Sequence, residues 1–167
     1  AVKAKVTLIE GHVMGGDCLN YGCVPSKALL RSAKLAKQLR TASDLGVADV
    51  VGRVDFPAVM ARVHEVIRTI APPDSVERYK SLGVEVLQGH ARIVTPWSVE
   101  VTTPNGAKHT LTTRSIVIAA GATPFVPPIP GLKEVGCLTS DTVWHLKSLP
   151  RAQVLEGNQI RRASCRE

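Results

Sequence analysis

The feature that most constrains this chain is a pair of cysteines, Cys18 and Cys23, just before a run of residues from Ala28 to Arg40 that is typical of a helix. Gly22 and Pro25 lie where that helix would begin, and we expect them to make its start irregular enough for the two side chains to meet. A helix N-terminus has unpaired N–H groups and a positive dipole end, which together lower the pKa of a thiol. The spacing therefore predicts a reactive cysteine pair.

The residues around the pair fit reactive chemistry. Gly15 and Gly16 come before it and would let the backbone approach a bound group closely. Lys27 adds a full positive charge one turn into the helix. On these residues alone, a structural disulfide or two buried thiols remains the alternative to a redox pair.

The stretch GGDCLNYGCVPSKALL, residues 15 to 30, resembles the active-site signature of the class I pyridine nucleotide-disulfide oxidoreductases, which are flavoprotein disulfide reductases. The family signature is GGTCxNxGC, then valine or isoleucine, proline, serine or lysine, and lysine. This sequence matches every fixed position except one, because Asp17 stands where threonine is usual. Ser26 brings the resemblance nearest to the mercuric reductase and dihydrolipoamide dehydrogenase branch.

The resemblance implies a role for each residue of the pair. Cys23 would be the thiol nearest the flavin, Cys18 the interchange thiol that meets the substrate, and Lys27 a residue near the flavin ring that tunes its electron affinity. It also implies that the intact protein is a homodimer. Electrons would pass from NAD(P)H through FAD to the Cys18–Cys23 disulfide, and on to a small-molecule disulfide or a metal ion.

The segment Lys5 to Glu10 is an apolar run that ends in an acid, typical of a buried parallel strand. In a dinucleotide-binding unit the second strand ends in an acidic residue that hydrogen-bonds ribose hydroxyls, and Glu10 has that position. The glycine turn and helix that should come before it are not in the sequence. We therefore expect a chain truncated inside the first crossover helix, with residues 1 to 5 as the end of that helix.

Two later segments also resemble the family. Residues 116 to 124 are typical of an apolar strand, residues 116 to 120, that enters a glycine turn. This resembles the family's second flavin motif, and the resemblance assigns Ala120 and Gly121 to the cofactor. Residues 138 to 141 resemble the family segment that passes near the flavin, and this resemblance assigns Asp141 to the cofactor. Alternatively, Asp141 would be the N-cap of a helix over residues 143 to 149. The candidate cofactor-binding residues are Glu10, Gly15, Gly16, Asp17, Ala120, Gly121 and Asp141.

The expected fold class is α/β: an incomplete Rossmann-like FAD-binding domain over residues 1 to 150, with an inserted antiparallel β meander. Its parts are a redox-active helix (14 to 40), a helical segment (55 to 82) and the meander (84 to 113). Residues 151 to 167 would be the truncated start of an NAD(P) domain and a tail that is disordered or non-native.

Inside the helical segment, Asp55 is the expected N-cap, Pro57 falls in the first turn, and Pro72-Pro73 ends the helix. A capping box at residues 74 to 77 would open a short second helix.

Composition excludes several function classes. The net charge of +7 comes partly from basic residues on the helix after the cysteines, without the aromatic interleaving of a nucleic-acid site.

No apolar run is long enough for a membrane span and no secretion signal is present, so a cytoplasmic location is expected. The five histidines lack metal-ligand spacing, and we predict no metal site. Cys137 and Cys165 have no partner spacing.

Two other functions remain as alternatives: a flavin-free dithiol protein and a non-enzymatic domain that kept only the fold. The cysteine spacing differs from the C-x-x-C of thioredoxin-type proteins, which argues against the first. The chain also lacks the nicotinamide and dimerisation domains and the histidine-glutamate pair of the family. We therefore expect the isolated chain not to oxidise NAD(P)H.

Overall fold

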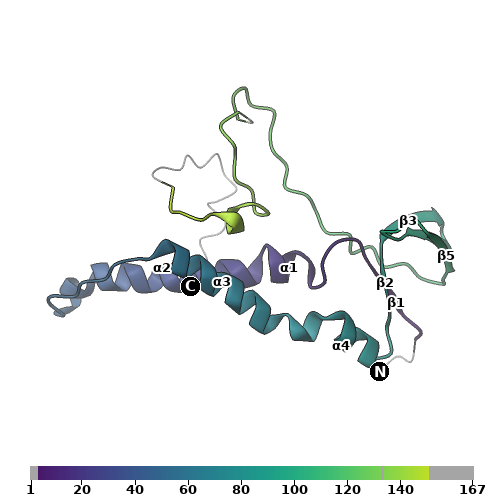
Figure 1. Cartoon of the computed structure of the whole chain (residues 1–167), viewed down its shortest axis with the longest axis horizontal. Coiled ribbons are helices and arrows are strands. Elements are labelled where there is room, and N and C mark those ends of the chain that lie inside the picture. Colours follow the sequence, from purple (N-terminus) through teal and green to yellow (C-terminus); the bar gives the residue numbers. More distant parts are fainter. Residues whose placement is uncertain (1–3, 133, 151–167) are drawn as a thin grey trace.

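The computed structural model describes residues 4–132 and 134–150, and the predictions for residues 1 to 3 and 151 to 167 lie outside this part of the chain. The molecule is elongated (Figure 1): helices α2 (Cys23–Arg40) and α3 (Phe56–Ile70) lie side by side, and the strands gather at the opposite end. Ala4 and Lys5 have no regular structure, so the expected helix end is not seen at these two residues.

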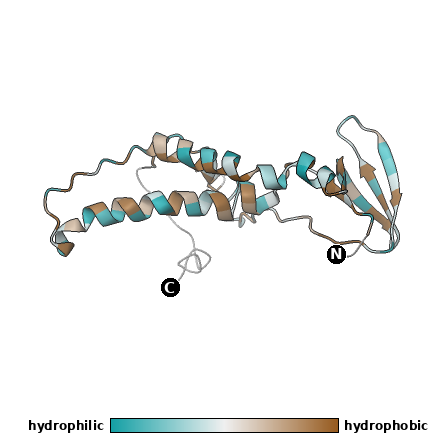
Figure 2. Cartoon of the chain, turned by 90° about the horizontal axis from the view of Figure 1, so that it is seen from below, coloured by the Kyte–Doolittle hydropathy of each residue, from teal (hydrophilic) through white to brown (hydrophobic). Residues whose placement is uncertain are grey.

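Helices α2 and α3 run antiparallel. The guanidinium of Arg62 on α3 donates to the backbone oxygen of Ala28 on α2 at 3.0 Å. Apolar and polar residues alternate along both helices (Figure 2), as expected for helices that bury one face. The buried core is formed by Ala28, Met60, Val63 and Trp144, so it lies between the two helices and a later segment of the chain.

Local sequence signals set the ends of α3 as predicted. The carboxylate of Asp55 accepts a hydrogen bond from the backbone N–H of Ala58 at 3.1 Å, which confirms the N-cap. Pro57 lies in the first turn, where its missing N–H costs nothing. The helix ends at Ile70, before the two prolines.

The prediction of one continuous redox helix over residues 14 to 40 is wrong. The structure has two helices, α1 (Gly16–Asn20) and α2, separated at Tyr21 and Gly22. Gly22 is the N-cap residue of α2 with φ −121 and ψ −104, which is not a helical conformation. The irregularity thus comes from Gly22, whereas Pro25 lies within the first turn of α2, where several N–H groups lack helical partners in any case.

The other helical elements are short. Helix α4 (Val76–Ser81) has Ser75 as its N-cap, and the Ser75 hydroxyl accepts from the backbone N–H of Arg78 at 3.2 Å. Gly83, with φ +83, follows the helix after Leu82. This confirms the predicted short helix and its end, but the N-cap is Ser75 and not Asp74, the first residue of the predicted capping box. The described part of the chain also contains three 3₁₀ turns: η1 (Ala42–Leu45), η2 (Pro72–Asp74) and η3 (Val143–His145).

The strands form two sheets. Strand β1 (Thr7–Glu10) pairs with β2 (Glu85–Gln88) in parallel, which confirms a parallel strand at the start of the chain. Strands β3 (His90–Thr95), β4 (Ser98–Thr102) and β5 (Lys108–Thr112) form an antiparallel meander. The fold is therefore mixed α/β, as predicted.

The predicted meander of residues 84 to 113 is wrong at its start, because β2 belongs to the other sheet. Gly89 separates the two sheets and has φ +154. A Cβ at this position would lie 2.5 Å from the backbone oxygen of Thr102, so only glycine lets the chain pass from one sheet into the other.

Two predicted elements near the C-terminal end differ from the structure. Residues 116 to 120 were expected to form a strand, but no described strand pairs with them, and Val117 is 88 % exposed. A strand needs a hydrogen-bonding neighbour, and the two described sheets do not offer one here. The expected helix over residues 143 to 149 is only the turn η3, and Thr142, not Asp141, occupies its N-cap position.

Replacing Val63 by alanine should destabilise the helical core by about 2 kcal/mol, because Val63 is completely buried and the change removes two carbons and leaves a cavity. The matched control is Val51→Ala, since Val51 is 95 % exposed and should change stability by less than about 0.5 kcal/mol. Urea unfolding followed by circular dichroism measures both. Equal effects would mean that Val63 is not in a core.

The meander contains a network of ion pairs around Glu100, which predicts that the stability of the fold depends on pH. Arg92 and Lys108 both contact Glu100 Oε1, at 3.2 and 3.3 Å, and the hydrogen bond from Arg92 is the main cause that lowers the pKa of Glu100 below its usual 4.5. A carboxyl with a depressed folded pKa stabilises the fold above its unfolded pKa, and this contribution is lost as the pH falls through the folded value.

We therefore expect the stability lost between about pH 6 and about pH 3 to be smaller in Glu100→Gln than in the parent protein. Thermal unfolding at several pH values measures this loss of stability, with Glu77→Gln on α4 as the control. An unchanged pH dependence would show that the network does not contribute.

Within the described residues, no helix has both the length and the apolar character needed to cross a membrane.

Candidate functional site

The two cysteines lie on either side of the break between α1 and α2. Cys18 is inside α1, Cys23 is the first residue of α2, and both are free thiols exposed to solvent. Gly22 makes the tight turn between them, since a Cβ there would lie 3.0 Å from the backbone oxygen of Asp17. The glycine thus allows the close approach that brings one cysteine toward the other.

The thiols are close enough to interact. The hydrogen bond between Cys18 and Cys23 is the main cause that raises the pKa of Cys18 above its ordinary value of 9.0. Lys27 acts in the opposite direction but more weakly. The sequence predicted a lowered thiol pKa at a helix start, and for Cys18 this prediction is wrong, because the neighbouring Cys23 raises the Cys18 pKa more than Lys27 lowers it.

Removing that neighbour should reverse the shift. In Cys23→Ala, the pKa of Cys18 should fall, because the hydrogen bond that retains the thiol proton is lost and the pull of Lys27 remains. The pH dependence of alkylation by iodoacetamide measures this pKa, with Cys137 and Cys165 replaced by serine. A pKa that rises or stays unchanged would show that the hydrogen bond with Cys23 does not hold the proton.

The two glycines before the cysteines have different roles. Gly15 has φ +86, and a Cβ there would lie 2.3 Å from the side chain of Leu19, so this glycine is needed for packing within α1. Gly16 has φ +55, and no atom lies within 4 Å of the place where its Cβ would be. Only Gly16 leaves the open space that a close backbone approach to a ligand requires.

A cavity of about 230 Å³ lies beside α1. Three chain segments meet there: the α1–α2 junction, the turn at residues 122 to 124, and residues 140 and 141. It is lined by Asp17, Tyr21, Gly22, Ala122, Thr123, Pro124, Ser140 and Asp141. The Gly121 Cβ position is 3.5 Å from the Asp17 carboxylate, so the glycine turn also reaches this site.

The structure thus brings Asp17, Gly121 and Asp141 together, although they are far apart in the sequence. Other candidates lie elsewhere. The carboxylate of Glu10 accepts from the backbone N–H of His12 at 2.7 Å, and Glu10 does not line the cavity. Ala120 is exposed and does not line it either.

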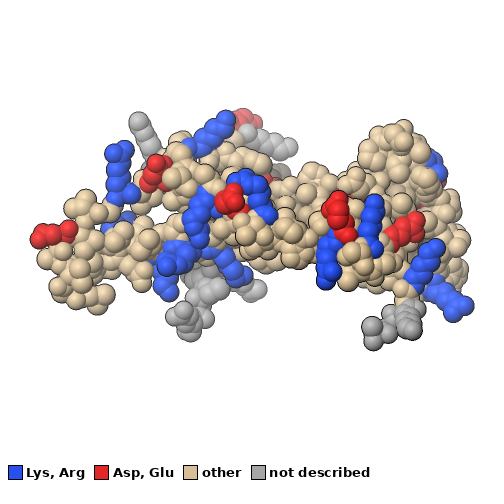
Figure 3. All heavy atoms as spheres, turned by 60° about the horizontal axis from the view of Figure 1, so that its bottom comes forward, with Lys and Arg blue, Asp and Glu red and all other residues tan. Residues whose placement is uncertain are grey.

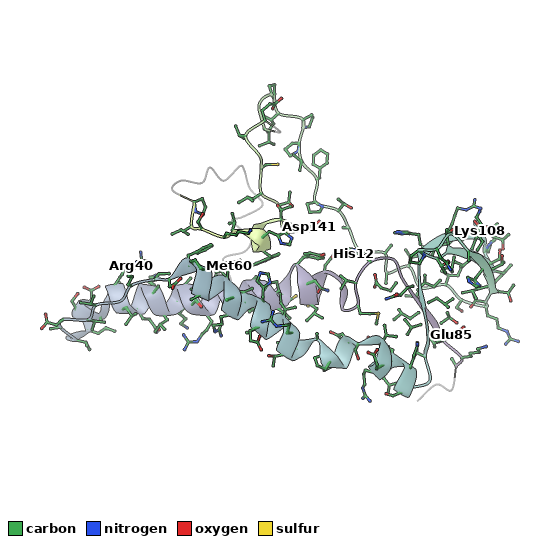
Figure 4. All side chains as sticks on the ribbon, viewed as in Figure 1. His12, Arg40, Met60, Glu85, Lys108 and Asp141 are labelled. Carbon is green, nitrogen blue, oxygen red and sulfur yellow. The ribbon has the colours of Figure 1, made fainter. Side chains whose placement is uncertain are left out.

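Sequence reasoning missed Trp144 and Tyr21. The indole N–H of Trp144 donates to the backbone oxygen of Tyr21 at 2.9 Å, which fixes η3 against the loop between the two cysteines. The hydroxyl of Tyr21 in turn lies 3.0 Å from His12 Nε2. Figure 4 shows His12 and Asp141 near the junction where these segments meet. Because the Trp144 bond ends on a backbone oxygen, no side-chain pattern in the sequence could reveal it.

Among the described residues, no group of three or more histidine, cysteine, aspartate or glutamate side chains is placed to hold a metal ion.

The chain has many relatives of known type. The family model described as pyridine nucleotide-disulphide oxidoreductase matches residues 1–159. The mercuric reductase of Lysinibacillus sphaericus is 32 % identical over 155 residues, which is 93 % of this chain and 28 % of the relative. The dihydrolipoyl dehydrogenase of Acholeplasma laidlawii is 34 % identical over 163 residues, 94 % of this chain and 46 % of the relative. The chain thus spans less than half the length of these proteins.

Solved structures agree with these matches. The HOCl-induced flavoprotein disulfide reductase RclA from Escherichia coli has a TM-score of 0.68 with 26 % identity, over 88 % of this chain and 30 % of that one. LpdA from Mycobacterium tuberculosis has a TM-score of 0.69 with 26 % identity, over 89 % of this chain and 33 % of that one.

Proposed function

Because the chain belongs to the pyridine nucleotide-disulphide oxidoreductase family, we propose that it is the part of an FAD-dependent disulfide reductase that carries the redox-active pair Cys18 and Cys23. The observation that supports this most is the placement of the two free, exposed thiols on either side of the break between α1 and α2, where Gly22 lets the backbone turn tightly. Both thiols are exposed, so a substrate can reach them. Residues 1 to 150 would form part of the FAD-binding domain.

The proposed reaction at the cysteines is thiol–disulfide exchange. The Cys18 thiolate attacks one sulfur of a substrate disulfide, forms a mixed disulfide, and releases the other half, which takes up a proton as a thiol. Cys23 then gives up its proton and attacks the Cys18 sulfur, which releases the second substrate thiol. The substrate gains two electrons and two protons, and the cysteines lose the same and form the Cys18–Cys23 disulfide.

In the intact protein, bound FAD would take a hydride from NAD(P)H and return two electrons to this disulfide. The residues around the 230 Å³ cavity fit part of FAD. The hydroxyls of Thr123 and Ser140 and the carboxylate of Asp141 can hydrogen-bond the hydroxylated portion of the cofactor, and Gly16 leaves open space beside them. The carboxylate of Asp17 does not fit the cofactor phosphates, because like charges repel.

Lys27 is proposed to act on the flavin ring, and Gly121 to let the backbone approach it. Lys27 lies one turn into α2 and is exposed. Glu10, at the end of β1, is the proposed partner for ribose hydroxyls, and Gly15 and Ala120 complete the proposed set. The substrate class is a small-molecule disulfide or a metal ion, and the intact protein is proposed to be a homodimer.

An absorbance spectrum tests this proposal. The purified chain is mixed with FAD, desalted, and measured before and after two-electron reduction with dithionite. A long-wavelength band from a thiolate beside the flavin should appear on reduction and be absent in Cys23→Ser, whereas Cys18→Ser should keep it. Bound flavin without the band in the parent protein would contradict the role of Cys23. Thiol exchange without any flavin binding would favour the flavin-free dithiol alternative if a chain extended by the glycine turn and helix that the family places before Glu10 also failed to bind FAD.

A further inference from the structure

A second cavity, away from the cysteines, has a lining that suggests a ligand. It has a volume of about 380 Å³ and lies between the first half of α3 and the residues of η3 and just after it. Helix α3 provides Pro57, Met60 and His64, and the later segment provides residues 144 to 147. None of these residues lines the cavity beside Asp17, so the two are separate sites.

The floor of this second cavity is apolar and belongs to the buried core. Met60 is 5 % exposed and Trp144 is 8 % exposed, and both belong to the buried core. Figure 4 shows Met60 on α3, on the side that η3 covers. The Trp144 N–H is already bound to the Tyr21 oxygen, so the indole offers only its apolar ring to a ligand. A methionine sulfur and an indole together favour contact with an aromatic ring.

The rim is basic. Within residues 4–132 and 134–150, the titratable residues that line the cavity are His64, His145 and Lys147, and no carboxylate of these residues lines it. His64 Nε2 lies 3.2 Å from the backbone oxygen of Trp144. Because a carbonyl oxygen can only accept a hydrogen bond, this nitrogen carries a proton and donates it. The hydrogen bond connects η3 to α3. Lys147 is exposed and provides a full positive charge at the entrance.

We propose that the cavity between α3 and η3 binds a small aromatic carboxylate, with its ring against Met60 and Trp144 and its negative charge toward Lys147 and His145. A cavity of this volume is in the usual range for small-molecule sites. Among the described residues, an apolar floor is combined with titratable groups that are all basic, and this combination selects an anion over a neutral or cationic ligand of the same shape. This site does not depend on the proposed redox function.

The test uses the whole chain and benzoate as the probe. Trp97 is 63 % exposed in the meander, so Trp97→Phe leaves Trp144 as the only tryptophan, and its indole N–H resonance reports on the cavity. Benzoate should shift this resonance in a saturable way. Benzamide, which has the same shape without the charge, should bind about tenfold or more weakly.

Variants of Lys147 and His145 test which basic side chain binds the carboxylate of the ligand. Lys147→Gln should weaken benzoate binding about five- to tenfold and leave benzamide unchanged, and His145→Gln should have a smaller effect in the same direction. Lys108→Gln is the matched control, because Lys108 lies on β5 at the far end of the molecule (Figure 4). Since Lys147 is exposed, the ligand-free resonance of Trp144 should stay in place and show that the variant is folded.

Three results would overturn the proposal: no saturable shift with benzoate, equal affinity for benzoate and benzamide, or no loss of affinity in Lys147→Gln. The second would mean that the cavity is a non-selective apolar site. The third would mean that the carboxylate is held elsewhere.

Discussion

With Cys137 and Cys165 replaced by serine, the chain should react with an excess of dithiobis(nitrobenzoate) to release two equivalents of thionitrobenzoate and keep none attached. The first cysteine to attack forms a mixed disulfide and releases one equivalent. The other cysteine, already within hydrogen-bonding reach, then displaces the second equivalent and closes the Cys18–Cys23 disulfide. Because the second attack occurs within one molecule, it should outrun a second reagent molecule by orders of magnitude.

Single variants of the pair should stop after the first step. In Cys18→Ser and in Cys23→Ser only one thiol remains at the junction, so each should release one equivalent and keep one thionitrobenzoate bound, which mass spectrometry detects. These two variants control for each other, since each keeps the backbone turn at Gly22. A parent protein that kept a thionitrobenzoate on each cysteine would show that the sulfurs do not meet, and the redox proposal would fail.

Several parts of the fold were predictable because their signals act locally. Asp55 and Pro57 fix the start of α3 through the backbone of a single turn, and two prolines stop it at Ile70. Gly22, the N-cap of α2, acts in the same way, since a Cβ there would approach the backbone oxygen of Asp17, only five positions away. Such constraints can be deduced from residue type and spacing alone.

The parts that were mispredicted depend on long-range pairing. Residues 84 to 94 have one continuous strand-like pattern, yet Gly89 divides them between two sheets, and the reason is the backbone oxygen of Thr102. Residues 116 to 120 have an apolar strand pattern, but β1 pairs only with β2 within the described residues. A pattern of residue types gives strand propensity, whereas the presence of a neighbouring strand decides whether a strand forms.

The candidate site shows the same division. The motif around Cys18 and Cys23 indicated the pair, because side-chain identity carries that information. The meeting of Asp17 with Gly121 and Asp141 was expected only through the family resemblance, since more than a hundred residues separate them. The bond from Trp144 to Tyr21 was not expected at all, because its acceptor is a backbone oxygen and Tyr21 occupies a variable position of the motif.

Asp17→Thr should strengthen FAD binding by about tenfold, corresponding to roughly 1.4 kcal/mol. The carboxylate lines the cavity beside the Gly121 turn, where the cofactor is proposed to bind. Two like charges repel, and solvent screening of this exposed side chain limits the gain from removing one of them. A threonine hydroxyl removes the repulsion and can donate to a phosphate oxygen.

The measurement is the dissociation constant of FAD from quenching of its fluorescence, in a chain extended at its N-terminus by the strand, glycine turn and helix that the family places before Glu10. Asp44→Thr is the matched control, because Asp44 is exposed on η1 and does not line the cavity. Asp141→Asn should act in the opposite direction, since a neutral amide accepts hydrogen bonds from cofactor hydroxyls more weakly than a carboxylate. Weaker FAD binding in Asp17→Thr would mean that Asp17 accepts from a hydroxyl as Asp141 is proposed to do, and the phosphates would then lie away from α1.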